Sequence, residues 1–377
     1  MIGLKRLCFI IMVLFLSCSV ASARIIKEGG DYVQEIAEAF EVGGGGTLSV
    51  EAIFGSMKAN LSEDGNVRVG IKEIADVSSE EKAKELFENL DVIIRQSGND
   101  VFVNVKKKKR FSGIKKLRLS FELSVPRNYN VGLNTGGGTI DVVELVGDAD
   151  LNSEGGSITM RHIEGNGEAK TGGGSIEIEG VSKNVSAKTG GGKIRMSNIS
   201  GNAKASTGGG SIEIEGVLKN VSAKTGGGSI EIMGSEGHVS ANTGGGSVRV
   251  GGSNGPVSVN TGGGGIDIEE AKGSISANTG GGSISAEVLG LQEKSDQIKL
   301  SSGGGSLTLH IPEDLPGSFD VELKLRRPKK DYRIISDFPL EIHEHSSKKT
   351  ASGDINGGGH RISLKTTNGN IKIKKLE

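Results

Sequence analysis

Apolar and polar residues alternate along most of this chain, and the alternation returns at a fixed interval. In the stretches SIEIE (175–179) and VSAK (221–224) every second residue is apolar, which is the pattern of a half-buried β-strand. From position 135 to position 279 the pattern returns at a constant interval without a slip. A short fixed period, here about 18 residues per coil, indicates a solenoid in which each unit covers the apolar face of its neighbour. This stretch therefore predicts stacked strands and excludes helices.

Stacking the units places like residues above one another in columns. Each unit contains the string Thr-Gly-Gly-Gly, with Ser153 starting the variant Ser-Glu-Gly-Gly. The threonines are expected to form a structural column at a turn, where their hydroxyls bond local backbone groups and one another along the stack: Thr135, Thr171, Thr189, Thr207, Thr225, Thr243, Thr261 and Thr279. Five positions later a large apolar column is expected to point into the core: Ile140, Ile158, Ile176, Ile194, Ile212, Ile230, Val248, Ile266 and Ile284.

The three glycines after each threonine lie where the chain must turn sharply between two strands. Because glycine alone reaches positive φ without a steric penalty, we expect them to supply that backbone geometry. Two positions before each threonine the residue is small in most units, as at Ala187 and Ala223. A large column facing a small one predicts a thin core without aromatic rings.

Composition agrees with such a core. The chain has 62 Gly among 377 residues, 10 Phe, 3 Tyr and no Trp, so glycine occurs at roughly twice its usual frequency. Lys and Arg total 45 against 46 Asp and Glu. This balance removes the overall electrostatic argument for a nucleic-acid partner. The one strong charge block runs from Lys106 to Arg110, with Lys115 and Lys116 nearby; it is interpreted as a solvated loop, with an anionic lipid or glycan surface as the alternative.

The first residues indicate export. Lys5 and Arg6 precede an apolar run, and Ala21 and Ala23 stand at the −3 and −1 positions of a cleavage site. No stretch is long enough for a membrane span in the mature chain. A lipoprotein site with Cys18 acylated is the alternative to ordinary cleavage. Cleavage after Ala23 would leave no cysteine, because both lie in this segment.

The sequence divides into four parts. Residues 1–23 are the predicted signal peptide, 24–130 N-terminal strands and a cap, 131–290 the regular solenoid, and 291–377 irregular C-terminal strands and a cap. A helix is predicted near residues 79–90, where Ser78 and Glu81 have the spacing of a capping box. A partial copy of the repeat at 367–373 predicts a strand that closes the C-terminal end.

Catalytic and ligand-binding patterns are weak. The exposed repeat positions mix Glu, Arg, Lys, Ser and Asn without the paired carboxylates of a glycosidase. The sequence predicts no catalytic residue, no metal site and no cofactor. Gly190–Lys193 resembles a phosphate loop, but Ile194 replaces the Ser or Thr that would hold magnesium.

Several motifs together resemble the bacterial putative-adhesin family of unknown function, DUF4097. They are GSMKA (55–59), LSVP (123–126), LTLHIP (307–312) and NGNIKI (368–373), with the repeated Gly-Ser-Ile-x-Ile strands between them. The resemblance covers nearly all of the mature chain. It implies a single-stranded, right-handed parallel β-helix with an adhesive or envelope-associated role, and the family has no established catalytic residues.

The function predicted from these observations is non-catalytic. The chain is expected to be an exported binding or scaffold protein of the periplasm, outer membrane or cell surface, or a secreted one, whose partner is a protein or glycan. A sensor domain accessory to envelope-stress signalling is the main alternative, and a carbohydrate-active enzyme is a third. The oligomeric state stays open.

Overall fold

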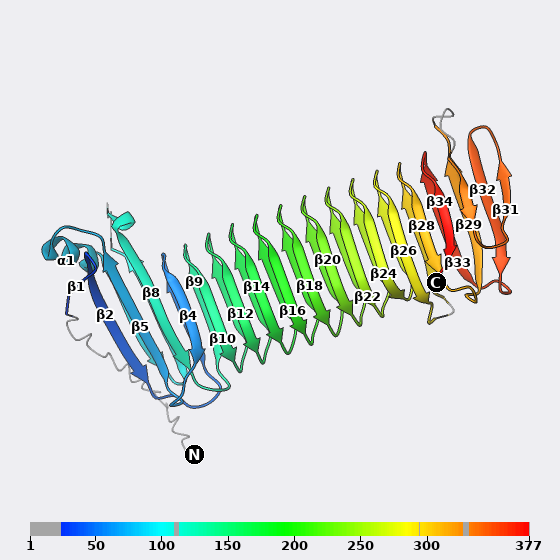
Figure 1. The fold of residues 1–377 in the computed structure, drawn as a ribbon. Coiled ribbons are helices and arrows are strands. Elements are labelled where there is room, and N and C mark those ends of the chain that lie inside the picture. Colours follow the sequence, from blue (N-terminus) through cyan, green and yellow to red (C-terminus); the bar gives the residue numbers. More distant parts are fainter. Residues whose placement is uncertain (1–23, 109–112, 294, 327–331, 377) are drawn as a thin grey trace, which may run out of the picture.

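The computed structural model describes residues 24–108, 113–293, 295–326 and 332–376. These residues form a long rod in which two large sheets, A and B, face each other (Figure 1). The described chain has 34 strands and one α-helix. The prediction of an all-β solenoid with a constant short period and an N-terminal cap containing one short helix is confirmed.

Each coil of the regular region has one strand in each sheet. Every strand pairs in parallel with the equivalent strand of the next coil, so Ile176 is level with Ile194 and Thr189 with Thr207. In sheet A these strands are β10 (Ile140–Leu145), β12 (Ile158–Ile163), β14 (Ile176–Val181), β16 (Ile194–Ile199), β18 (Ile212–Val217), β20 (Ile230–Ser235), β22 (Val248–Ser253), β24 (Ile266–Lys272), β26 (Ile284–Gly290) and β28 (Leu307–Ile311). In sheet B they are β9 (Asn130–Thr135), β11 (Ala149–Ser153), β13 (Gly167–Thr171), β15 (Val185–Thr189), β17 (Ala203–Thr207), β19 (Val221–Thr225), β21 (Val239–Thr243), β23 (Val257–Thr261), β25 (Ile275–Thr279) and β27 (Gln297–Ser302).

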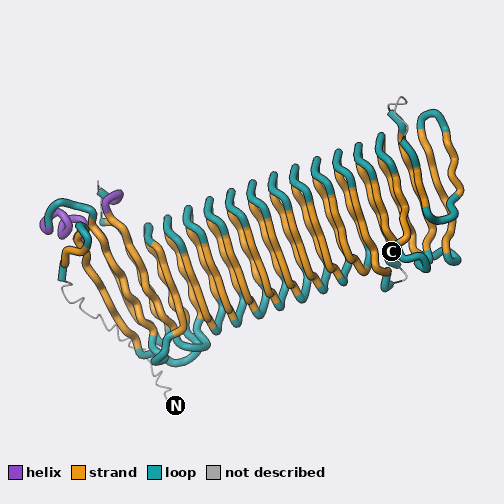
Figure 2. The backbone as a smooth tube through the Cα atoms, in the orientation of Figure 1, coloured by secondary structure: helices purple, strands orange, loops and turns teal. Residues whose placement is uncertain are grey.

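The connections between strands lie along the two long edges of the rod (Figure 2). The Thr-Gly-Gly-Gly connections run from sheet B to sheet A, as at residues 190–193, and we call the edge that they form the glycine edge. The connections from sheet A to sheet B, as at 182–184, form the opposite edge. We call it the asparagine edge, because Asn184, Asn202 and Asn220 recur there.

The strands of sheet A depart from strict alternation at one position per coil. In β14 both Glu179 and Gly180 point outward, so Ile178 and Val181 can both be buried. The second outward residue has positive φ throughout the regular region: Glu144, His162, Gly180, Asn198, Gly216, Gly234, Gly252 and Glu270, with φ between 53° and 69°. A left-handed residue thus bends every coil of sheet A, and the alternation expected from sequence fails there.

The N-terminal cap combines antiparallel strands with the helix. Helix α1 (Glu80–Glu88) buries Ala83, Leu86 and Phe87. Its N-cap is Ser79, whose hydroxyl accepts from the Lys82 backbone N–H at 3.4 Å, so the capping box predicted at Ser78 is wrong by one residue. The cap strands are β1 (Ile26–Glu28), β2 (Asp31–Phe40), β5 (Val67–Ala75) and β6 (Leu90–Ser97).

The first coils are not stacked in chain order. Strands β3 (Thr47–Ala52) and β4 (Ser56–Leu61) lie between the later pair β7 (Asp100–Lys107) and β8 (Leu117–Val125) and the first regular pair, β9 and β10. A short 3₁₀ turn, Ile114–Lys116, precedes β8. An early segment of the chain is therefore held on both sides by strands that follow it in sequence.

The C-terminal end is interleaved in the same way. Strands β33 (His360–Thr367) and β34 (Ile371–Lys375) lie between β27–β28 and the coil formed by β29 (Gly317–Lys324) and β30 (Ile334–Ser336). Strands β31 (Glu341–Glu344) and β32 (Lys348–Ile355) continue sheet B outward as an antiparallel pair. The prediction that the last strand closes this end is wrong, because β30 lies beyond β34 in sheet A. Strand β34 pairs in parallel with β28 (Leu307–Ile311), whose buried residues are level with its own.

Candidate functional site

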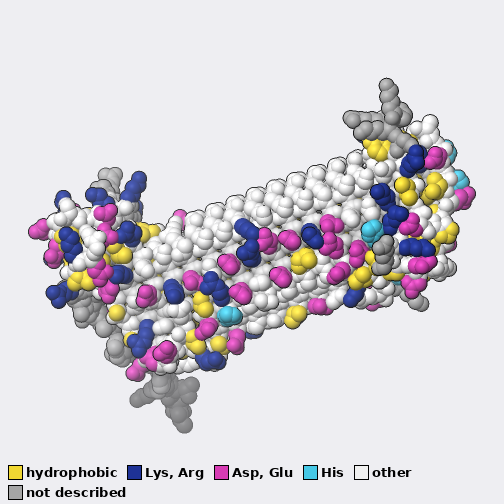
Figure 3. Space-filling view, in the orientation of Figure 1, with side chains coloured by type: hydrophobic (Ala, Val, Ile, Leu, Met, Phe, Trp, Pro, Cys, Tyr) yellow, Lys and Arg dark blue, Asp and Glu magenta, His cyan; other side chains and the backbone are white. Residues whose placement is uncertain are grey.

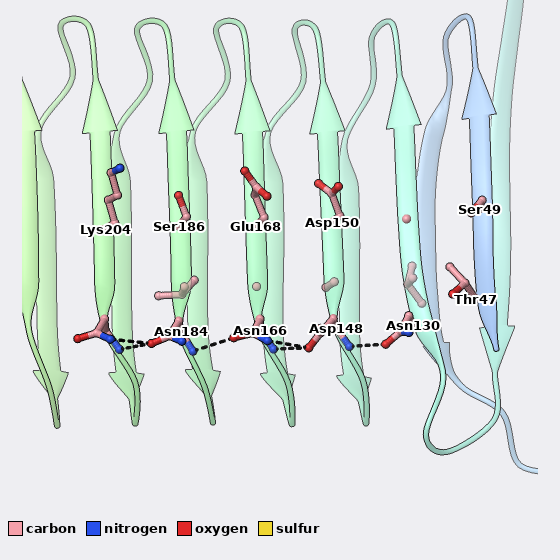
Figure 4. A pocket seen from close by; sticks show the side chains of 16 residues that line it. Thr47, Ser49, Asn130, Asp148, Asp150, Asn166, Glu168, Asn184, Ser186 and Lys204 are labelled. Atoms are coloured by element: carbon pink, nitrogen blue, oxygen red, sulfur yellow. Dashed lines mark hydrogen bonds between the residues drawn. The ribbon is translucent and has the colours of Figure 1, made fainter. Parts of the chain in front are cut away.

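A groove crosses the outer face of sheet B in the N-terminal half of the rod (Figure 4). It has a volume of about 740 Å³. Its walls come from the same positions of successive strands, β3, β9, β11, β13, β15 and β17, so it runs along the rod axis across several coils. The lining residues are Thr47, Ser49, Asn130, Val131, Gly132, Asp148, Ala149, Asp150, Asn166, Gly167, Glu168, Asn184, Val185, Ser186, Asn202 and Lys204.

One wall of the groove is a ladder of side chains at the asparagine edge. The Oδ1 atom of Asn184 accepts from the backbone N–H of Asn202 at 3.0 Å and from its Nδ2 at 2.8 Å. Asn130, Asp148, Asn166, Asn202 and Asn220 also accept from the backbone N–H of the next coil, at 2.7–3.3 Å. These side chains satisfy turn N–H groups that no strand pairing reaches. They also present a row of amide edges to the groove (Figure 4).

The second wall is the outward column of sheet B. It consists of Ser49, Gly132, Asp150, Glu168, Ser186 and Lys204, which are level with one another in the parallel register. Glu168 is paired with Lys170, two residues along the same strand. Short side chains at 49, 132 and 186 keep the groove open, and the carboxylates near its centre give it a negative character.

The floor of the groove depends on packing inside the rod. Gly167 is buried, and a Cβ there would lie 2.6 Å from Sδ of Met160 on the facing sheet. Met160 has no exposed surface. A larger residue at 167 would therefore push against a filled core, so the shape of the groove is fixed by the volumes of core side chains beneath it.

The isoleucine column lies in the core along its whole length. Ile140, Ile158, Ile176, Ile194, Ile212, Ile230, Val248, Ile266 and Ile284 are each at most 2% exposed and belong to one continuous apolar cluster. They support both sheets but do not line the groove described above.

The threonine column lies buried at the glycine edge, away from the groove. The hydroxyl of each threonine from Thr171 to Thr279 donates to the carbonyl oxygen of the glycine three positions after the Thr, or after Ser153, of the preceding coil, at 2.7–2.9 Å. The hydroxyl oxygen of the same threonine accepts from the backbone N–H of the third glycine in its own turn, at 3.1–3.2 Å. Thr135 donates likewise to Gly55, at 2.9 Å.

The turn glycines are required for a reason other than the one expected. Among the repeated triples only Gly138 has φ in the left-handed region, at 130°. The third glycines instead pack against the coil before them: a Cβ at Gly192 would lie 2.0 Å from the carbonyl oxygen of Gly174. At the middle glycine, such as Gly191, a Cβ would meet nothing within 4 Å. Close approach of backbones, rather than backbone conformation, therefore accounts for the third glycine of each triple but not for the middle one.

Three predicted residues lie outside the described part of the chain. They are the cleavage-site alanines Ala21 and Ala23 and the alternative lipidation site Cys18. The last two positions of the basic run, 109 and 110, lie outside it as well. Among the described residues, no helix combines the length and the apolar character that crossing a bilayer requires.

The asparagine ladder was missed by the sequence analysis, although its signal was present. Asn166, Asn184, Asn202 and Asn220 recur at the same interval as the threonines. Amide side chains stacked at one strand spacing can bond along the stack. Reading that column in the same way as the isoleucines would have located one wall of the groove.

The groove presents polar side chains at a regular spacing along the rod. Within the described ranges no three His, Cys, Asp or Glu side chains are grouped closely enough to hold a metal ion. Amide groups, hydroxyls and carboxylates repeated at one strand spacing form many weak polar contacts, each modest in net free energy. Such an arrangement suits an extended ligand that engages several coils at once.

Comparison with known proteins supports the resemblance for part of the chain. Residues 204–374 match the model of the family described as Toastrack DUF4097. The match is narrower than the nearly complete coverage expected from the motifs. No curated protein matches the chain at a significant level.

The solved structures that are similar to this chain include the following three. A "putative adhesin" from Bacteroides fragilis NCTC 9343 is 13% identical, with 91% of this chain and 97% of that chain covered and a TM-score of 0.26. A "putative adhesin" from Parabacteroides distasonis ATCC 8503 is 12% identical, with 74% of this chain and 97% of that chain covered and a TM-score of 0.30. A "putative lipid binding protein" from Parabacteroides distasonis ATCC 8503 is 14% identical, covering 73% and 96%, with a TM-score of 0.26. The match to the family model is confined to residues 204–374, less than half of the chain.

Proposed function

We propose that this chain is a non-catalytic binding or scaffold rod of the cell envelope, exported by its N-terminal segment, and that it binds an extended polar ligand along the groove of sheet B. The observation that carries the proposal is the continuity of the groove across six strands, with the same wall positions used in each coil. A polymer with regularly spaced polar groups, either glycan or extended peptide, matches such a surface. A small substrate would need only one coil.

The chemistry of the walls supports a hydroxyl-rich or amide-rich ligand. Each asparagine amide has two N–H donors, and the ladder uses one of them at Asn166 and at Asn202. The carboxylates of Asp150 and Glu168 accept hydrogen bonds from the other side. Donors and acceptors thus face each other across the groove.

Blocking the groove tests this function. Ser186→Trp places a large ring in the groove, whereas Ser258→Trp places the same ring at the equivalent position of β23, outside the groove and in the same column of sheet B. Binding of each purified protein to bacterial envelope fractions and to a panel of envelope glycans would be measured. We expect Ser186→Trp to lose at least tenfold in affinity and Ser258→Trp to bind like the parent chain.

The outcome that contradicts the proposal is equal behaviour of the two variants, or no retention of the parent chain on any of these materials. The same glycans are then assayed for new reducing or unsaturated ends. Their appearance would favour a carbohydrate-active enzyme over a binding protein.

A further inference from the structure

Positively charged residues lie at both ends of the glycine edge. The connection from β7 to β8 and the connection from β29 to β30 both run from sheet B to sheet A, as the Thr-Gly-Gly-Gly connections do. The described residues on either side of each connection therefore lie at the glycine edge, and β8 and β29 are near opposite ends of the rod (Figure 1).

The basic group at the N-terminal end contains Lys106, Lys107, Lys108, Lys115 and Lys116. All five are exposed. In the described part of the chain none of them forms an ion pair with a carboxylate, although Asp91 is level with Lys106 in the pairing of β6 and β7. Their charges are therefore directed to solvent.

The basic group at the C-terminal end contains Arg326, Arg333 and Lys348. Arg326 follows β29, Arg333 precedes β30, and Lys348 begins β32. The backbone N–H of Leu325 donates to the carbonyl oxygen of Ser347 at 2.8 Å, which brings the β31–β32 turn beside the β29–β30 connection. These residues are exposed, and they are close together at one corner of the rod.

The edge between the two groups is almost uncharged. From residue 136 to residue 306 the Thr-Gly-Gly-Gly connections contain one acidic residue, Glu154, and one basic residue, Lys193; the others are Gly, Ser and Thr. Figure 3 shows this edge as a band with few acidic or basic side chains between the charged ends. A flat partner can approach most of such an edge closely, because Gly, Ser and Thr side chains are short and uncharged.

The separation of the two groups indicates the kind of partner. Thirteen strand spacings lie between β7 and β29 in sheet B, which is roughly 60 Å at about 4.8 Å each. This distance is several times the Debye length of about 8 Å at physiological salt, so the two groups act independently. A linear polyanion would favour a continuous positive stripe, which this edge lacks. A flat anionic surface contacts both ends at once.

We propose that the glycine edge rests on an anionic lipid bilayer, held by the two basic groups. Each lysine or arginine near such a surface contributes attraction, and attachment at two points raises the apparent affinity above that of either end. The rod then lies along the membrane, with the asparagine edge directed away from it. This inference does not depend on the groove, whose ligand is tested separately.

Vesicle binding tests the proposal. The chain would be sedimented with vesicles in which one lipid in three is phosphatidylglycerol and the rest phosphatidylcholine, and with pure phosphatidylcholine vesicles. One double variant combines Lys108→Ser and Lys116→Ser in the N-terminal group, and a second combines Arg326→Ser and Lys348→Ser in the C-terminal group. A quadruple variant carries all four substitutions. The matched control is Lys183→Ser with Lys219→Ser, which removes two exposed lysines from the asparagine edge.

The expected result is binding to the anionic vesicles only, and its loss at about 0.5 M NaCl, where surface charges are screened. Each of the two double variants should bind anionic vesicles at least about tenfold more weakly than the parent chain. The quadruple variant should bind them no better than the parent chain binds phosphatidylcholine vesicles. The control variant should bind like the parent chain. Thermal melting of every variant shows that it is folded. Equal losses in the control, or no preference of the parent chain for anionic vesicles, would overturn the proposal. So would binding to heparin at the same residues without binding to vesicles.

Orientation on the membrane provides a second readout. Gly209→Cys on the glycine edge and Lys219→Cys on the asparagine edge, each with Cys8→Ser and Cys18→Ser, would carry a fluorophore. We expect a quencher on the lipid headgroups to quench the label at 209 more strongly than the label at 219. Equal quenching would contradict a rod that rests on its glycine edge.

Discussion

The hydroxyl of Thr189 donates to the carbonyl oxygen of Gly174 in the preceding coil at 2.7 Å, and its oxygen accepts from the N–H of Gly192 at 3.2 Å. In the next coil the carbonyl oxygen of Gly192 accepts from the hydroxyl of Thr207 at 2.9 Å, so each such glycine bonds one threonine through its N–H and another through its carbonyl oxygen. Thr189 is 3% exposed. In such surroundings polar groups that lose their partners are costly.

Thr189→Val keeps the shape of the side chain and removes the hydroxyl. We expect the free energy of unfolding to fall by about 1–3 kcal/mol, because Gly174 and Gly192 each lose a partner in a buried site. Thr189→Ser keeps the hydroxyl, as Ser153 does in the natural sequence, and should lose less. Denaturant unfolding measures both; a valine variant as stable as the serine variant would show that these two hydrogen bonds contribute nothing.

The glycine triples predict opposite outcomes at neighbouring residues. A Cβ at position 192 would lie 2.0 Å from the carbonyl oxygen of Gly174 and 2.4 Å from its carbon, and backbone atoms cannot move aside cheaply. Gly192→Ala should therefore destabilise the rod by about 3 kcal/mol or more. Gly191→Ala, where the space is open, should change stability by less than about 1 kcal/mol in either direction. Equal melting temperatures would refute this assignment of roles.

The left-handed column of sheet A predicts a stabilising substitution. His162 has φ of 54°, a conformation that costs a non-glycine residue about 1–2 kcal/mol, whereas Gly180 fills the equivalent place in the next coil with φ of 69°. His162→Gly relieves this strain but raises the conformational entropy of the unfolded chain, which offsets part of the gain. The free energy of unfolding should therefore rise by about 0.5–1 kcal/mol. Gly180→Ala should lower it by about 1 kcal/mol. Thermal unfolding of the pair checks both signs.

Glu73 predicts a pH dependence of the N-terminal cap. This residue of β5 is 1% exposed, level with Gln34 of β2 and Leu119 of β8, and burial raises the pKa of its carboxyl group from 4.5 to about 7. The folded state therefore holds a proton that the unfolded state releases. The contribution of the protonated Glu73 carboxyl group to the free energy of unfolding is complete below about pH 4.5. It is lost as the pH rises through about 7, a change of about 3 kcal/mol.

Glu73→Gln should remove that loss of stability between pH 4.5 and 7. Glu63→Gln, at an exposed position of the same cap, should leave it in place. The measurement is the denaturation midpoint of the cap across this pH range, followed by hydrogen exchange in β2, β5 and β8. A parent chain whose cap gains stability over the same range would contradict the assignment.

The regular part of the fold could be predicted from the sequence because each column repeats its residue type. Ile176, Ile194 and Ile212 show both the interval and the buried face without any knowledge of distant contacts. The alternation of 175–179 ends at Gly180, where two successive residues point outward, and this bend was not predicted from the sequence. The recurrence of glycine or asparagine at 180, 198 and 216 was the available signal.

The ends could not be predicted in this way. The pairing of β4 with β8 and β10, and of β34 with β28 and β30, joins segments that lack the common period. Strand order there is decided by which buried faces match across many residues of intervening chain. The groove was likewise missed, because it arises from the asparagine ladder and the outward column of sheet B together and not from any single motif.

The interleaved ends make the two termini of the rod independent of its length. Adding or removing one repeat unit between Thr171 and Thr279 alters neither β3–β4 nor β33–β34, because those strands contact only their own neighbours. Tandem duplication within a gene can therefore lengthen such a protein in steps of about 4.8 Å, while both termini remain locked against fraying. The span between the two basic corners would change by the same increments, so related proteins of different repeat number would bridge different distances with unchanged ends.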